Sequence, residues 1–208
     1  MAESGPIEIN TFSPVWTAGW QWPWVVVMAL IVAGNFLFVS DQIYLGTGLL
    51  IGGLALTGLG VRAVVNGAAD ALADGTNKLC RAAAGIDSEV DEASVYAVTA
   101  AKGSVLGLDA AKGSVLGLDV AKRYRATVLT VGEDAVTVYD DAMVNLFNTK
   151  WSLATDSEEI PYERIDGIAY ADGSVQLCLP DGERSYPADE RPADLIAAIE
   201  QRLSAGET

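Results

Sequence analysis

Two long segments without a charged residue, separated by only three polar residues, limit what this chain can fold into. Residues 22–39 and 43–61 contain no Asp, Glu, Lys or Arg, and only Ser40-Asp41-Gln42 stands between them. Each segment has about the 18 to 20 residues that an α-helix needs to cross roughly 30 Å of hydrocarbon. The pattern predicts a transmembrane helical hairpin over residues 22–66, preceded by an N-terminal tail over residues 1–21.

Aromatic residues surround the predicted hairpin. Trp16, Trp20, Trp22 and Trp24 stand around the start of the first span, and Tyr44 follows the short turn. Indole and phenol side chains prefer the membrane interface, because the ring is apolar while its polar atom stays hydrated. We therefore expect these five residues to mark the two faces of the membrane.

The second predicted span is rich in glycine, which lets helices approach closely. Gly48 and Gly52 share one side of a helix, and Gly53 follows them directly. The packing partner is either the first span or a neighbouring copy of the chain. Asn35, an amide inside the first span, predicts a polar contact between helices.

The basic residues near the hairpin predict its orientation. The N-terminal tail and the turn contain no Lys or Arg, whereas Arg62, Lys78 and Arg81 follow the second span. The positive-inside rule then places the C-terminal part of this integral membrane protein in the cytoplasm, and two spans place the N-terminal tail there too. Without a basic n-region, a secretory signal is a poor fit.

Residues 67–125 form an Ala- and Gly-rich connector that we expect to be mainly helical. One helix is predicted over residues 67–84 with an interruption at Gly75, and a second helix is predicted from Ser88. Residues 100–119 contain the decapeptide AAKGSVLGLD twice. Its ten-residue period suits strands, whereas its Ala, Lys and Leu favour helix. The repeat is either a tolerated duplication or a self-assembly surface.

From residue 126 to 208 the apolar period changes to two, which predicts an antiparallel β domain. Strands are expected at residues 127–131, 135–139, 144–153, 165–170, 174–179 and 183–186. Asp172-Gly173 is a strong hairpin signal, and a C-terminal helix is predicted from Pro192. The expected fold class is α+β, with a small β-barrel or curved antiparallel sheet that is capped by one C-terminal helix.

The run from Glu159 to Ile168, with the later hairpin and C-terminal helix, makes residues 126–208 resemble the pleckstrin-homology-like (PH-like) domains of prokaryotic membrane proteins. The I-P-Y-x-x-I segment from Ile160 to Ile165 carries most of the resemblance. The resemblance implies a seven-stranded, helix-capped barrel that binds or scaffolds without a catalytic centre. This chain departs from lipid-binding members, because its first strands lack clustered Lys and Arg.

The charge of the chain excludes some partners. The chain has 28 acidic and 13 basic residues, and residues 126–208 have 17 acidic and 5 basic residues. Such a domain repels nucleic acid, and we do not expect it to bind anionic lipid headgroups. Acidic excess with few lysines resembles the proteins of salt-loving microbes, since concentrated salt screens self-repulsion. An ordinary acidic protein is the alternative.

Little in the sequence points to catalysis. The chain has no histidine, its two cysteines lie far apart, and its turn glycines form no phosphate-binding loop. We therefore expect no catalytic residue, no metal site and no cofactor. Phe147, Trp151 and Tyr162 are candidates for a partner-binding surface, with core packing as the alternative.

These patterns favour a membrane-anchored interaction or scaffold protein that is not an enzyme. The first alternative is a structural subunit of a homo-oligomeric membrane assembly, such as a ring, a pore-like layer or the membrane component of a particle. The Gly-rich span and the repeat at residues 100–119 suggest this alternative. The second alternative is an accessory subunit of a membrane complex.

Overall fold

The computed structural model describes residues 3–40, 42–86, 94–101 and 121–206, and the chain forms two compact units. The helical unit contains the described residues between 9 and 71. The β unit contains residues 3–8, 72–86, 94–101 and 121–206. Apart from Ala100 and Ala101, the decapeptide repeat lies outside the described residues, as does the predicted helix start at Ser88.

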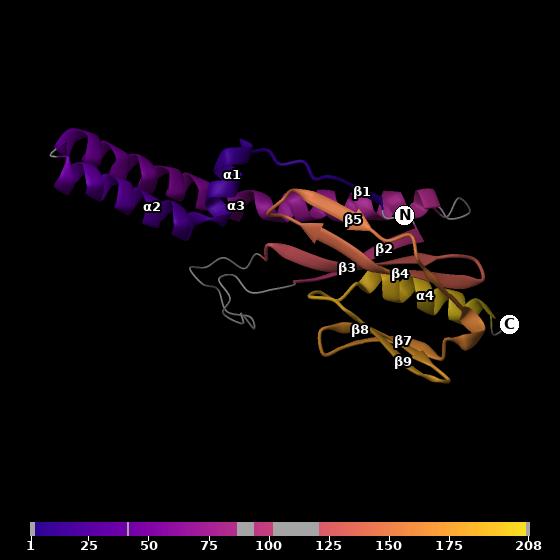
Figure 1. The fold of residues 1–208 in the computed structure, drawn as a ribbon. Coiled ribbons are helices and arrows are strands. Elements are labelled where there is room, and N and C mark those ends of the chain that lie inside the picture. Colours follow the sequence, from indigo (N-terminus) through magenta and orange to yellow (C-terminus); the bar gives the residue numbers. More distant parts are fainter. Residues whose placement is uncertain (1–2, 41, 87–93, 102–120, 207–208) are drawn as a thin grey trace. The chain divides into compact units, whose positions relative to one another are not determined.

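The helical unit is an antiparallel pair of helices preceded by a short one. Helix α1 (Ser13–Trp20) leads into α2 (Trp22–Gly34), which continues as a π-helical turn over Asn35–Val39. Helix α3 (Ile43–Ile86) then returns beside α2 (Figure 1). Gly46 lies against Ala33 and Leu37 of the preceding segment, and Gly53 lies against Ala29, as expected for a helical hairpin.

The first sheet of the β unit is antiparallel and contains a strand from the predicted N-terminal tail. Its strand order is β1 (Glu3–Pro6), β5 (Lys150–Leu153), β4 (Ala135–Asn145), β3 (Arg123–Val131) and β2 (Val95–Ala101), and β6 (Glu158–Pro161) also pairs with β4. Glu3 pairs with Leu153 and Pro6 with Lys150. Residues 3–6 of the predicted N-terminal tail are therefore part of the sheet.

The second sheet is an antiparallel three-stranded meander. A 3₁₀ turn, η4 (Tyr162–Arg164), precedes β7 (Gly167–Ala171), β8 (Ser174–Leu179) and β9 (Gly182–Pro187). Asp172 and Gly173 join β7 to β8 with φ angles of 52° and 70°. Two left-handed residues are the geometry of a tight hairpin turn, so the Asp-Gly prediction is confirmed.

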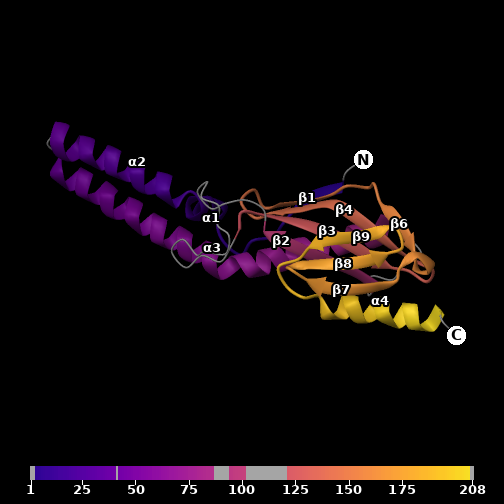
Figure 2. The same cartoon turned by 90° about the horizontal axis from the view of Figure 1, so that it is seen from below.

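The two sheets and helix α4 (Ala193–Gly206) share one apolar core. The sheets contribute residues such as Leu129, Val136 and Leu177, and α4 contributes Leu195 and Ile199. In Figure 2, α4 lies along the β7 side of the second sheet. The helix that was expected from Pro192 is therefore present, and it packs into the core of the β unit.

The opposite face of the first sheet is covered by the C-terminal part of α3. Leu79 and Ala83 on α3 are fully buried. Gly75 approaches the sheet closely, since a Cβ there would lie 2.8 Å from Val144 Cγ1. Because both faces are covered, adjacent residues of β3 such as Val128 and Leu129 are both fully buried.

Two expectations about the connector are wrong. Residues 95–101 form strand β2, in register with β3, where a helix was predicted. Val95 and Val98 are both buried, and they point to opposite faces of a strand that is covered on both faces. Helix α3 also continues through Gly75 without interruption. The glycine does not break the helix, and its lack of a side chain lets the helix lie close to Val144 of the sheet.

Two expectations about the β domain also need correction. The described strands form two separate sheets, so the closed barrel is wrong and the curved-sheet alternative is closer. Between β6 and β7 the chain turns through η4 instead of continuing the ladder, and α4 contributes to closing the core there. Residues 144–153, which were predicted to be one strand, instead contain the end of β4, a turn and β5. Leu146, the first residue after β4, is fully buried although it lies outside the strand.

Candidate membrane-anchoring site

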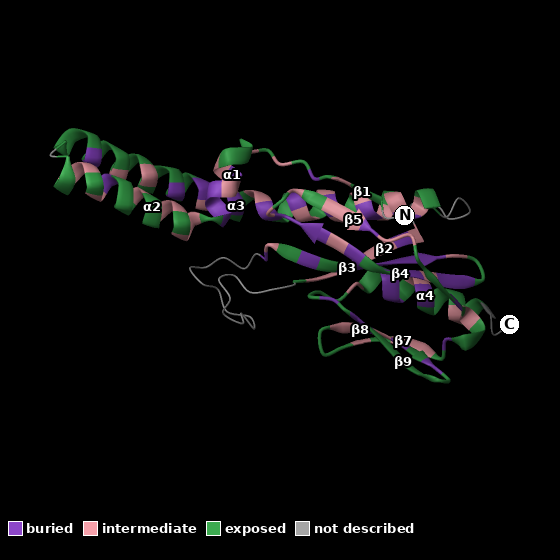
Figure 3. Ribbon diagram, in the orientation of Figure 1, coloured by how far each residue is buried: buried purple, intermediate pink, exposed green. Residues whose placement is uncertain are grey.

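The helical unit exposes an unusually large amount of apolar side chain. Two helices, Trp22–Val39 and α3, are long and apolar enough to cross a membrane. Only 6% of the first apolar window and 17% of the second is buried. A core helix of a soluble protein is hydrophobic all round because it is buried, whereas these helices are hydrophobic and exposed (Figure 3).

All but one of the exposed large apolar side chains of the described residues lie in the helical unit, and the exception is Ile86 at the end of α3. Phe12 precedes the hairpin, and on the hairpin they are Trp24, Val27, Met28, Leu30, Ile31, Val32, Phe38, Val39, Ile43, Tyr44, Leu45, Leu49, Ile51, Leu54, Leu56, Leu59 and Val65. Among the described residues between 94 and 206, no large apolar side chain is exposed in this way. Soluble monomers rarely expose a contiguous apolar patch of this kind.

The predicted interfacial aromatic residues fall into two groups. Trp24 and Tyr44 are 69% and 95% exposed, so their rings are available to a membrane interface. Trp16 and Trp20 are buried and meet edge to face, with ring centroids 6.1 Å apart. Trp22 is half-buried. The two buried indoles hold α1 within the helical unit.

Helix α1 packs on α3 through a glycine contact that the sequence reasoning missed. Gly19 of α1 faces Gly60 of α3, and a Cβ on Gly60 would lie 2.6 Å from the Gly19 backbone nitrogen. Gly67 of α3 lies next to the Trp16 ring. The spacing of Gly60 and Gly67, two helical turns apart on one face, is a sequence signal from which this contact could have been predicted.

The predicted helix-packing residues do not all pack. Gly53 contacts α2 through Ala29, but Gly48 and Gly52 have open space where a side chain would be. Asn35 is exposed and begins the π-helical turn, where its carbonyl oxygen accepts a hydrogen bond from the Ser40 N–H. The Gly48–Gly52 side therefore faces away from the first span.

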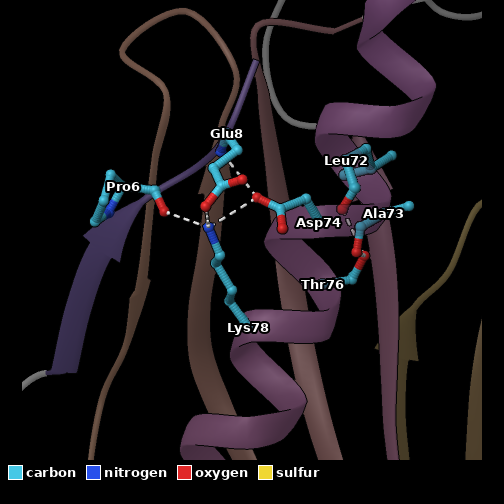
Figure 4. Close-up of polar contacts among 7 residues, drawn as sticks. All are labelled: Pro6, Glu8, Leu72, Ala73, Asp74, Thr76 and Lys78. Carbon is cyan, nitrogen blue, oxygen red and sulfur yellow. Dashed lines mark hydrogen bonds and ion pairs between the residues drawn. The ribbon is translucent and has the colours of Figure 1, made fainter. Parts of the chain in front are cut away.

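A polar clamp in the β unit joins the two segments of chain that lead into the helical unit (Figure 4). The Glu8 N–H donates to Asp74 Oδ2 at 2.8 Å, and Lys78 Nζ donates to the Pro6 carbonyl oxygen at 3.1 Å. Lys78 also forms ion pairs with Asp74 at 3.0 Å and with Glu8 at 3.8 Å. The clamp ties the residues after β1 to α3.

The charge of Asp74 is stabilised within this clamp. Partial burial raises the pKa of its carboxyl. The hydrogen bond from the Glu8 N–H and the Lys78 ammonium lower this pKa, and their combined effect is larger, so the net pKa is below the ordinary value of 3.8. A lowered folded-state pKa contributes stability above the unfolded-state pKa, and this contribution is lost as the pH falls through the folded-state pKa.

Asp74→Asn is expected to destabilise the β unit by about 1 kcal/mol at neutral pH, because the amide keeps an acceptor for Glu8 but loses the charge. The difference from the unsubstituted chain is expected to shrink as the pH falls below 3.8. Chemical unfolding of the detergent-solubilised chain across this pH range measures it. The exposed Asp156→Asn is the matched control, and a pH-independent difference for Asp74→Asn contradicts the assignment.

The three candidates for a partner-binding surface do not lie together. Phe147 is half-buried, and the Lys122 ammonium lies 5.6 Å from its ring centroid. Trp151 lies against Gly5 of β1. Tyr162 belongs to the opposite end of β4, where its hydroxyl donates to the Gly132 carbonyl oxygen, and burial raises the pKa of this hydroxyl.

Within the part of the chain that the structure describes, no three His, Cys, Asp or Glu side chains are arranged to hold a metal ion. No protein-family model, curated protein or solved structure matches this chain. The features from which a function can be inferred are therefore the hairpin, the clamp and the charges of the β unit.

Proposed function

We propose that this chain is a non-enzymatic, membrane-anchored interaction protein, in which the helical hairpin holds a PH-like β domain at the cytoplasmic face. The observation that carries the proposal is the exposed apolar surface of the hairpin. Large apolar side chains are exposed along both helices, and neither apolar segment contains a charged residue. A bilayer is the environment that covers such a surface without a dedicated partner.

The clamp and β1 support a chain that crosses the membrane an even number of times. Residues 3–8 precede the first apolar helix, and residues 72–86 follow the apolar part of the second. Both segments belong to the β unit, through the pairing of β1 with β5 and the bonds from Asp74 and Lys78. The chain thus leaves the β unit, forms the hairpin and returns to it.

The PH-like assignment rests on the order of elements in the C-terminal domain. Strands β2, β3, β4 and β6 belong to the first sheet, β7, β8 and β9 form the second, and a C-terminal helix follows. The resemblance implies a seven-stranded, helix-capped barrel, and what supports the proposal is the coarser likeness of antiparallel strands that share a core with one closing C-terminal helix. Domains of this class act through surface contacts, which agrees with the absence of histidine chemistry in the sequence.

Topology mapping in sealed membrane vesicles tests the anchor and its orientation. We expect the chain to resist alkaline carbonate extraction, because its apolar helices lie within the bilayer. Epitopes at the two ends are expected to be digested together by protease added to the cytoplasmic face, and protected together on the other face. Release by carbonate refutes the anchor, and protection of only one end refutes the hairpin.

A homo-oligomeric membrane assembly is the second candidate, and one observation favours it. Gly48 and Gly52 face away from the first span and have open space around them, so a helix from another copy has room to approach closely. Light scattering of the detergent-solubilised chain in near-molar salt distinguishes the candidates. A discrete multiple of 21.8 kDa favours the assembly, and a monomer favours the anchored interaction protein.

A further inference from the structure

The basic residues on the strands of the first sheet, Arg123, Arg125 and Lys150, all lie at one end of that sheet. Arg123 on β3 pairs in register with Asn145 on β4, which pairs with Lys150 on β5. Residues in one row across a sheet point to the same face, and strands lie about 4.8 Å apart. Arg123 and Lys150, distant in sequence, therefore lie about 10 Å apart on one face.

Two further side chains extend this row into a basic edge, which we define as Lys122, Arg123, Lys150 and Phe147. The backbone N–H of Phe147 donates to the Lys122 carbonyl oxygen, and the Lys122 ammonium lies over the Phe147 ring. In the described part of the chain, no ion pair involves the three basic residues of this edge. Their charges are therefore available to an external anion.

Two acidic residues of the described chain that lie near the basic edge are engaged in other contacts. Asp140 accepts a hydrogen bond from Arg125 at 2.9 Å and another from Thr127. Asp189 lies beside β2, where its carboxylate accepts the N–H of Ala101. Between residues 142 and 155 the only charged residue is Lys150.

Distance separates the basic edge from the turn between β3 and β4, where Glu133 and Asp134 lie. Strand β3 runs from Arg123 to Val131, so this turn is about 27 Å from the basic edge at about 3.3 Å per residue. The Debye length is about 8 Å at physiological ionic strength. These acids therefore do not cancel the local potential, although they contribute to the negative net charge.

The basic edge also lies where the chain leaves the β unit for the hairpin. Lys150 pairs with Pro6, and the Ile7 N–H donates to the Thr149 carbonyl oxygen at 2.9 Å. The next residue, Glu8, is held by Asp74 of α3. Both connections to the apolar helices therefore start from the end of the sheet that carries the positive charge.

We propose that the basic edge is a lipid-contact surface that binds the anionic headgroups of the bilayer in which the hairpin is anchored. This inference rests on the proposed membrane anchor. It differs from the expectation drawn from the net charge, according to which the whole acidic domain repels anionic lipid headgroups. Lys122, Arg123 and Lys150 supply the attraction, and Phe147 supplies an apolar ring at the same place.

An environment-sensitive fluorophore at the turn between β4 and β5 tests this contact in the full-length chain. The label is attached through Asn148→Cys in a Cys80→Ala, Cys178→Ala background, and the chain is reconstituted into phosphatidylcholine vesicles with or without about 30% phosphatidylglycerol. We expect emission about twofold higher in the anionic vesicles, and we expect molar salt to abolish the increase.

Two triple variants with the same change in net charge make the test specific. Lys122→Gln, Arg123→Gln and Lys150→Gln together are expected to abolish the increase. The control combines Arg164→Gln, Arg191→Gln and Arg202→Gln, and it is expected to keep the increase. Equal emission in both vesicle types, or equal loss in both variants, overturns the proposal. Carbonate extraction of the same samples reports separately whether the anchor itself has failed.

Discussion

Replacing Leu30 and Ile51 with arginine is expected to release the chain from the membrane. Both side chains are more than half exposed and lie near the middle of the two apolar segments. An arginine at the centre of a membrane-spanning helix costs about 2.5–3.5 kcal/mol in insertion, so the pair costs about 5–7 kcal/mol. The measurement is the fraction of the chain that stays in the pellet after carbonate extraction.

The matched control adds the same two charges beyond the apolar segment of α3. Asn66 and Asn77 are exposed on this helix, and Asn66→Arg with Asn77→Arg is expected to leave the membrane fraction unchanged. If the Leu30 and Ile51 double variant stays in the membrane to the same extent as this control, the exposed apolar side chains do not face lipid, and the proposed anchor is wrong.

The second large effect is expected in the β core. Leu177 on β8 is fully buried within the core that the two sheets and α4 share. Leu177→Ala removes three side-chain carbons and leaves a cavity, which costs about 2–5 kcal/mol. Denaturant unfolding followed by circular dichroism is expected to show a lower midpoint with an unchanged slope.

Its neighbour provides a control on the same strand. Cys178 is exposed because successive residues of a strand point to opposite faces. Cys178→Ala is expected to change the free energy of unfolding by no more than about 0.5 kcal/mol. If both substitutions have similar effects, β8 does not form a shared core with the first sheet.

The parts of the fold that were predictable from sequence are those with a local physical cause. Charge-free segments of sufficient length predicted the two apolar helices, and the second begins at Ile43 as expected. The Asp172-Gly173 turn followed from the residue types that tolerate left-handed backbone. The C-terminal helix followed from its apolar face, and Leu195 and Ile199 are fully buried.

The parts that were not predictable depend on contacts between distant residues. Val95 and Val98 are three residues apart, a spacing that fits a helix face, yet they lie in a strand whose two faces are both covered. Gly75 reads as a helix breaker until Val144, 69 residues later, is seen to pack against it. The polar segment around Pro6 carries no strand signal and becomes β1 only by pairing with β5.

The candidate site shows the same division. Exposure of Trp24 and Tyr44 agrees with an interfacial role that composition suggests, whereas burial of Trp16 depends on Gly67 of a different helix. The basic edge was invisible in the net charge, because sheet register alone brings Arg123 and Lys150 into one row. A count of charges along the chain does not show that a few basic residues gather at one place on an acidic domain.

The pairing of β1 with β5 has a consequence for synthesis. Glu3 pairs with Leu153, so β1 is synthesised about 150 residues before its partner strand. At about 5–20 residues per second, this delay is about 8 to 30 s, during which the apolar hairpin has already emerged. In the proposed topology, β1 therefore has to stay unpaired, on the side of the membrane where β5 will fold, until the hairpin is in place. Its short polar sequence, Glu-Ser-Gly-Pro, is compatible with this delay, because it has no large apolar side chain that would aggregate or enter the membrane while the strand is unpaired.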